Sequence, residues 1–164
     1  MRKLQRLQGV AVIEVAEDAE GWHVVKDSPM NRRITHLTPL KIAGPAAAHA
    51  LLKTDADPTG TERLGTFNNC CAGRTPWRTY LTFEENFNGY FTQPAAPSDD
   101  LAGEAAARYD LAGGSAAQHN WDRLDDRFDL TKEPNEAHRH GWIVEVNPFE
   151  PDAKPRKLSA LGRF

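Results

Sequence analysis

Short runs of β-branched and aromatic residues alternate with turn residues along most of this chain. The runs at residues 9–15 and 22–26, separated by a turn, predict a β-hairpin, and residues 31–35 predict another short strand. The same reading predicts further strands, at residues 64–67, 79–83, 141–146 and 157–164. Between these strands lie clusters of Gly, Pro, Asn and Asp, which favour turns.

Helical signals are few and short. The Ala-rich residues 42–52 contain Gly44 and Pro45 and predict either a helical turn or a loop, whereas residues 104–111 predict a short helix. Residues 113–118 predict a flexible insert. Because no long amphipathic helix separates the strands, the pattern favours an all-β sandwich, barrel or propeller over a βαβ fold.

Composition narrows the class of protein. The chain has 164 residues, of which 40% are hydrophobic and 26% charged, which is typical of a folded domain. A membrane span is excluded because no apolar run approaches the ~20 residues that a spanning helix needs. The net charge of −3 argues against a nucleic-acid or anionic-membrane partner. Although Arg2, Lys3 and Arg6 open the chain, Glu14 interrupts the apolar segment that follows, so we expect no signal peptide.

Candidate chemistry gathers in residues 65–91. Cys70 follows one predicted strand, and Glu84 and Glu85 follow the next, so a thiolate and a carboxylate could meet at one rim and bind a metal. A thiolate favours a transition metal, and carboxylates also suit calcium or iron. Adjacent strand residues point to opposite faces, so only one glutamate of the pair is expected at such a site. A buried, inert cysteine and solvated glutamates are the simpler alternative.

The adjacent cysteines, Cys70 and Cys71, would pair only with strain, so we expect no structural disulfide between them. They are inert, redox-active or metal-binding. A redox module is the weakest of these interpretations, because the spaced Cys-x-x-Cys motif is absent.

His138 and His140 could form a metal-binding segment, but we expect them to be solvated histidines of a loop. The aspartates of residues 122–129 lack the glycine and glutamate of an EF-hand and predict a solvated acidic segment.

The motifs of residues 65–91 resemble the signature of the PhoX-type alkaline phosphatases. That signature runs Asn-Asn-Cys, Gly-x-Thr-Pro-Trp-Gly-Thr and Glu-Glu-Asn, and the matching segments here are residues 68–70, 73–79 and 84–86. Residues 9–15, 27–35, 141–149 and 160–164 also resemble the family, in consistent order. The resemblance therefore covers nearly the whole chain.

The resemblance implies an all-β fold, part of a six-bladed β-propeller, in which residues 1–164 supply about two blades with their insertions. It implies ferric iron and calcium as cofactors, and hydrolysis of phosphate monoesters by a monomeric enzyme that is periplasmic or secreted. By position, Cys70 matches the iron-ligating cysteine, and Glu84 and Glu85 match the acidic pair, of which either could be the ligand. Arg163 near the chain end is assigned no role.

The chain also departs from the family pattern. Cys71, Ala72 and Arg78 replace the residues usual there, and Arg78 adds a side chain at a turn position that needs backbone freedom. Family members are several hundred residues long, so we expect this chain to be a fragment that is inactive alone. The competing hypothesis is a non-catalytic β-propeller module for surface attachment or protein interaction.

Overall fold

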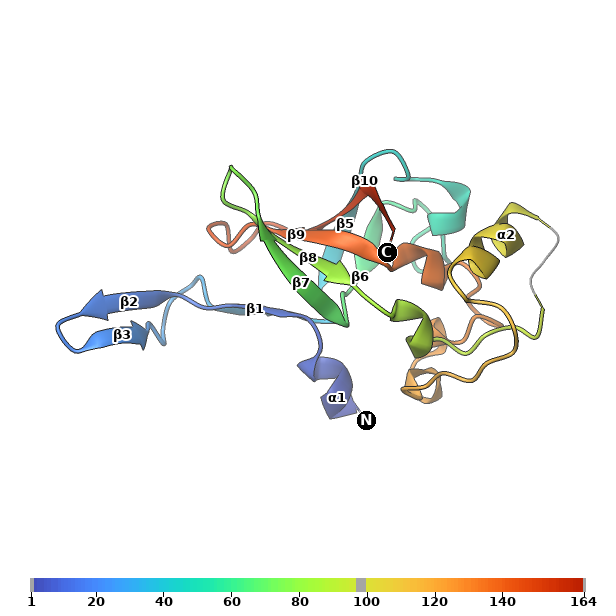
Figure 1. Cartoon of the computed structure of the whole chain (residues 1–164), viewed down its shortest axis with the longest axis horizontal. Coiled ribbons are helices and arrows are strands. Elements are labelled where there is room, and N and C mark those ends of the chain that lie inside the picture. The colour runs from blue at the N-terminus through green and yellow to red at the C-terminus, as the bar shows by residue number, and fades with distance from the viewer. Residues whose placement is uncertain (1, 97–99, 164) are drawn as a thin grey trace.

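The computed structural model describes residues 2–96 and 100–163 (Figure 1). Its regular structure in those residues is mostly β, with few and short helices, as the sequence predicts. The last residue of the predicted strand 157–164 lies outside the described residues. None of the described helices is long and apolar enough to cross a lipid bilayer.

The centre of the molecule is a six-stranded sheet with the strand order β6-β5-β10-β9-β8-β7. Its strands are β5 (Pro39–Ala43), β6 (Glu62–Leu64), β7 (Asn69–Arg74), β8 (Tyr80–Glu84), β9 (Trp142–Val146) and β10 (Arg156–Arg163). Strands β7 to β10 form an antiparallel meander, and β10 also pairs with β5 in parallel. The predicted strands 79–83, 141–146 and 157–164 correspond to β8, β9 and β10.

A small ribbon covers part of this sheet. It pairs β1 (Val10–Val12) with β4 (Arg32–Ile34), and helix α1 (Arg2–Leu7) precedes it. Val10 and Val12 pack against a buried cluster that joins the ribbon to the sheet and consists of Ile34, Leu40, Val144 and Val146. The apolar side chains of the ribbon thus cover the apolar residues on one face of this part of the sheet.

The predicted N-terminal hairpin is wrong in its extent and pairing. Residues 9–15 divide into β1 and β2 (Val15–Asp18), and β2 pairs with β3 (Gly21–Val24) in a shorter hairpin. β1 pairs instead with β4. The physical reason is burial: the β1 valines pack on the sheet core, whereas Val15 and Val24 lie beyond its edge and are exposed.

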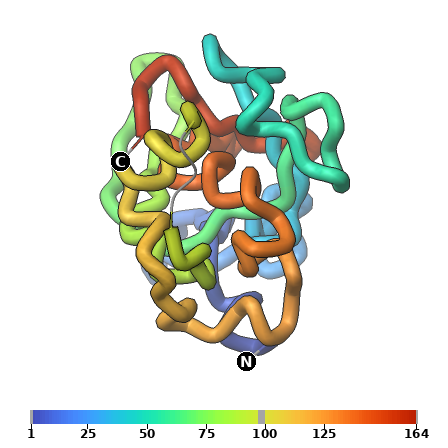
Figure 2. The backbone as a smooth tube through the Cα atoms, turned by 90° about the vertical axis from the view of Figure 1, so that its right-hand side faces the viewer, coloured from blue at the N-terminus to red at the C-terminus, as the bar shows by residue number. Residues whose placement is uncertain are grey.

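A loop-rich layer, residues 85–141, joins β8 to β9. It contains α2 (Leu101–Arg108) and the 3₁₀ turns η2 (Phe87–Tyr90), η3 (Trp121–Arg123), η4 (Asp126–Phe128) and η5 (Glu136–Arg139), while η1 (Ala50–Leu52) lies before β6. Figure 2 shows this layer, coloured yellow to orange, in front of the sheet. An aromatic core holds it together: Phe67, Phe87, Tyr90, Phe91, Trp121 and Phe128 are buried.

Candidate functional site

Cys70 lies inside β7, one residue after its start, rather than beyond the end of an earlier strand as the sequence predicts. It pairs with Phe83 of β8, and a β-bulge follows it before Gly73. Thr82 Oγ1 donates hydrogen bonds to the carbonyl oxygens of Cys70 (3.1 Å) and Cys71 (3.3 Å). These hydrogen bonds hold the bulge in place. Cys70 and Cys71 form no disulfide, and both are exposed.

Glu85 is the carboxylate on the same face as Cys70, because Cys70 pairs with Phe83 and the Glu85 amide donates to the Asn68 carbonyl oxygen at 3.2 Å. The hydrogen bond between the Glu85 side chain and the Cys70 thiol raises the pKa of that thiol, and the Glu85 charge acts in the same direction. Asn68 Nδ2 donates to the Glu85 carbonyl oxygen at 2.5 Å, which fixes the backbone at this point. One thiol and one carboxylate thus share the exposed rim where β7 begins and β8 ends.

Glu84 points the other way, into the protein, and is fully buried. Its Oε1 accepts a hydrogen bond from Lys157 Nζ at 2.5 Å, and its Oε2 accepts one from the Trp142 amide at 3.3 Å. Both carboxylate oxygens therefore already have partners. The adjacent glutamates thus face opposite sides of the sheet, and Glu85 is the one on the side of Cys70.

Lys157 is the buried cation that the sequence reasoning missed. Desolvation by burial lowers the pKa of Lys157 to about 7, and the charge of Glu84 opposes that shift. Its Nζ also donates to the Arg139 carbonyl oxygen at 3.0 Å. In the structure Lys157 alternates with exposed Arg156 and partly exposed Leu158 on β10, and its side chain faces the layer of residues 85–141. The sequence carries no signal for this burial.

His138 and His140 are buried, so the prediction of solvated loop histidines is wrong. Both belong to the layer of residues 85–141, and the ring of Phe67, from outside that layer, lies against the His140 ring with 4.2 Å between the centroids. Burial is the largest cause that lowers the pKa of His138 to about 4, and it also holds the pKa of His140 well below its ordinary value. Both rings are therefore neutral near pH 7.

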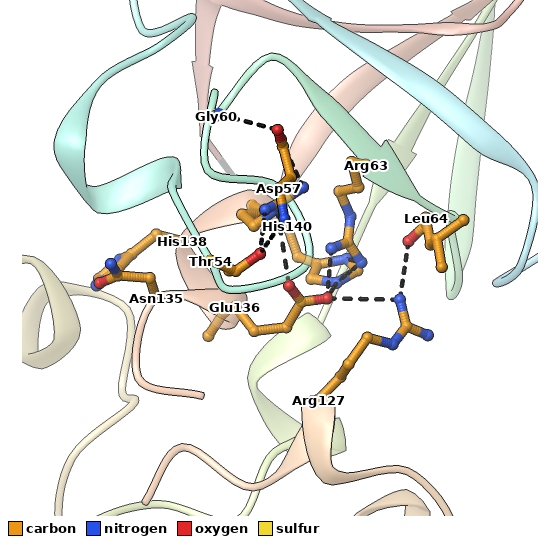
Figure 3. Close-up of polar contacts among 12 residues, drawn as sticks. Thr54, Asp57, Gly60, Arg63, Leu64, Arg127, Asn135, Glu136, His138 and His140 are labelled. Carbon is orange, nitrogen blue, oxygen red and sulfur yellow. Dashed lines mark hydrogen bonds and ion pairs between the residues drawn. The ribbon is translucent and has the colours of Figure 1, made fainter. Parts of the chain in front are cut away.

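The charge network continues from His140 to a cavity of about 280 Å³ beside β6 (Figure 3). Arg63 contacts His140, and its Nη1 lies 2.6 Å from Glu136 Oε1. Arg127 lies 3.5 Å from the same oxygen, and Arg139 Nη2 lies 3.2 Å from Asp57 Oδ2. Glu136 and Asp57 oppose these arginines, and the ion pairs hold the layer of residues 85–141 to β6.

The donor chemistry of the rim fits part of a metal site. A thiol and a carboxylate suit iron, and the carboxylate also suits calcium. The residues described here contain no group of three or more His, Cys, Asp or Glu side chains placed to hold a metal ion. Cys70 and Glu85 thus supply two donors, and a complete coordination sphere requires others.

The family described as "Alkaline phosphatase PhoX" matches residues 1–164. A solved structure, described as "Pseudomonas fluorescens PhoX in complex with vanadate, a transition state analogue", is 49% identical and superposes with a TM-score of 0.84. The match covers 95% of this chain and 26% of that one, so the present chain spans about a quarter of its relative. No curated protein matches the chain. A family match over the whole sequence, together with the shared fold, establishes that this chain belongs to the PhoX alkaline phosphatase family.

Proposed function

We propose that this chain supplies part of the metal site of an enzyme that hydrolyses phosphate monoesters with ferric iron and calcium. The observation that carries the proposal is that Cys70 and Glu85 lie on the same face of the β7–β8 pair, at the exposed rim where β7 begins and β8 ends, within a chain of the PhoX family. The vanadate of the Pseudomonas fluorescens relative, a transition-state analogue, supports phosphoryl chemistry for this fold.

Within this proposal Cys70 is an iron ligand and Glu85 is the carboxylate ligand beside it. Bound cations would neutralise the phosphate oxygens and lower the pKa of an oxygen nucleophile. When the Cys70 thiol loses its proton, its hydrogen bond to Glu85 is lost as well. The Cys70 sulfur and the Glu85 carboxylate then both become available to bind a metal. Thr82 keeps the bulge carbonyls in place, so the position of the Cys70 sulfur does not depend on a mobile loop.

Glu84 has a supporting role in the proposal. Its ion pair with Lys157 ties the end of β8 to β10, and its contact with the Trp142 amide ties it to β9. Glu85 follows directly in the chain, so this anchor sets where the ligand carboxylate lies. Glu84 is thus a positioning residue and not a ligand.

We further propose that the meander of β7 to β10 is one blade of a β-propeller, with β7 as its innermost strand. Antiparallel pairing of these strands and the exposure of Cys70 on the β7 edge support this arrangement. The propeller would be that of a monomeric enzyme, periplasmic or secreted, as the family resemblance implies. The described residues offer only two rim donors, so we expect the isolated chain not to hydrolyse phosphate esters.

The test is a chimera in which this chain replaces the matched quarter of Pseudomonas fluorescens PhoX. We expect Cys70→Ser and Glu85→Gln to lower both bound iron and phosphomonoester turnover, on the order of a hundredfold for turnover. Cys71→Ser, which changes the neighbouring exposed thiol, is the matched control and should leave both unchanged. Normal iron and turnover in Cys70→Ser would refute the assignment, and a chimera that folds without turnover would favour a non-catalytic module.

A further inference from the structure

The hairpin of β2 and β3 forms an arm, residues 13–24, that extends away from the six-stranded sheet (Figure 1). In its register Val15 pairs with Val24, and Glu17 pairs with Trp22. Directly opposed residues, and residues two apart on a strand, share a face of the ribbon. Val15, Trp22 and Val24 therefore lie on one largely apolar face of the arm, which they share with Glu17.

This apolar face is open to solvent. The exposed fraction is 51% for Val15, 69% for Trp22 and 48% for Val24, and Ile13 just before β2 is 56% exposed. A two-stranded hairpin alone is marginally stable in water, because one face of a ribbon buries too little apolar surface. The arm therefore needs a covering surface to be stable in this form.

The base of the arm is fixed, so the arm is presented in a defined direction. Asn31 Oδ1 accepts a hydrogen bond from the Glu14 amide at 2.7 Å, and Asn31 Nδ2 donates to the Val25 carbonyl oxygen at 2.7 Å. The amide of Val25 donates to the Glu14 carbonyl oxygen at 3.0 Å. These bonds join both strands of the arm to the segment that leads into β4, whose partner β1 packs on the sheet core.

Charge indicates what kind of surface covers the arm. Residues 13–24 carry four carboxylates and no lysine or arginine, and one of the carboxylates, Asp18, lies 3.2 Å from His23. An anionic lipid surface would repel this arm. Two arms meeting face to face would place like charges together. The complementary surface is therefore an apolar protein face bordered by basic residues.

We propose that the arm is the docking surface through which this unit joins the rest of a PhoX-type domain. The family match spans residues 1–164, a range that includes the arm. In the Pseudomonas fluorescens relative the matched unit is 26% of the chain, which leaves most of that domain available to cover it. This inference concerns assembly and stands whether or not the proposed metal chemistry is correct.

Hydrogen exchange read by mass spectrometry tests the proposal directly. We expect the amides of residues 13–24 to exchange on the order of tenfold or more faster in the purified 164-residue chain than in the aligned segment of intact Pseudomonas fluorescens PhoX. Equal rates in the two proteins would overturn the proposal. Arm protection that rises with the concentration of the 164-residue chain would also overturn it, since a second copy would then be the occupant.

Substitutions in the chimera identify the docking face. The pair Trp22→Ser and Val24→Ser removes apolar groups from the proposed face, and we expect arm exchange to return to the rate of the isolated chain. The matched pair Ala16→Ser and His23→Ser lies on the opposite face and should retain protection. Loss of protection from the second pair alone would show that the wrong face has been assigned. Exchange needs no bound metal and no turnover, so failure here is distinct from failure of the phosphatase proposal.

Discussion

Lys157 and Glu84 form an ion pair with no exposed side-chain surface, with 2.5 Å between Nζ and Oε1. The pair connects β10 to β8 across the intervening strand β9. His140 Nδ1 lies 3.6 Å from the same carboxylate oxygen, and because His140 is neutral near pH 7 it does not replace the lysine as a counter-charge. The stability of the end of β8 therefore depends on Lys157.

Replacing Lys157 by Met should lower the free energy of unfolding by about 3–5 kcal/mol, because Glu84 would remain as a buried charge without its ion-pair partner. Urea denaturation followed by circular dichroism measures this change. The matched control is Lys154→Met, which removes an exposed pair with Glu62 and should cost about 0–1 kcal/mol. Adding Glu84→Gln to Lys157→Met should recover part of the loss. A Lys157→Met protein as stable as the Lys154→Met protein would contradict the prediction.

His138 should make stability depend on pH below neutrality. Burial, followed by the charges of Arg163 and His49, lowers the pKa of His138 from the ordinary 6.5 to about 4 in the folded chain. Between these values the unfolded chain binds a proton that the folded chain does not. The contribution of His138 is therefore fully present above pH 6.5 and is lost as the pH falls toward 4.

The expected slope from His138 is about 1.4 kcal/mol per pH unit within that window. Denaturation at a series of pH values measures it, and the difference between the wild-type and His138→Gln profiles isolates this residue from other titrating groups. The His138→Gln profile should be flatter between pH 6.5 and 4. Parallel profiles for the wild type and His138→Gln would show that His138 has no such linkage.

Arg78 lies in the left-handed region, with a φ of 73°, at the turn between β7 and β8. The sequence predicted a need for backbone freedom there, and the structure agrees. Arg78→Gly should be about 1 kcal/mol more stable than Arg78→Ala, because only glycine adopts this φ without strain. Comparing the two variants cancels the contact of the guanidinium with the Phe149 ring, which both lose. Thermal unfolding decides the order, and equal midpoints would show that the turn relaxes at no cost.

Local pattern predicted much of the sheet but not its long-range pairing. The apolar run of β9 reads as a strand because alternation and β-branched residues act within a few positions. The pairing of β1 with β4 depends on which valines reach the sheet core, and the parallel pairing of β5 with β10 joins segments far apart in the sequence. No local window contains that information. The motif placed Cys70 beside an acidic pair, but the geometry was needed to separate Glu85 from Glu84.

The buried charges could not be predicted, for a physical reason. Lysine and histidine in a short polar segment are normally solvated, so the sequence pattern of Lys157 and His140 favours exposure. Their burial follows from the aromatic layer of residues 85–141, which covers the sheet only after distant segments have packed. The network is thus a consequence of tertiary structure that composition and periodicity do not encode.

The contact between Cys70 and Glu85 makes a prediction about thiol reactivity. The hydrogen bond to Glu85 raises the pKa of the Cys70 thiol, so the reactive thiolate is scarce near neutral pH. In a Cys71→Ser background, which leaves Cys70 as the single cysteine, Glu85→Ala should increase the rate of iodoacetamide alkylation on the order of two- to fivefold. Glu17→Ala on the arm is the control and should not change the rate. An unchanged rate in Glu85→Ala would mean that the carboxylate does not bind the thiol proton. That result would argue against the proposal that Cys70 and Glu85 act together as metal ligands.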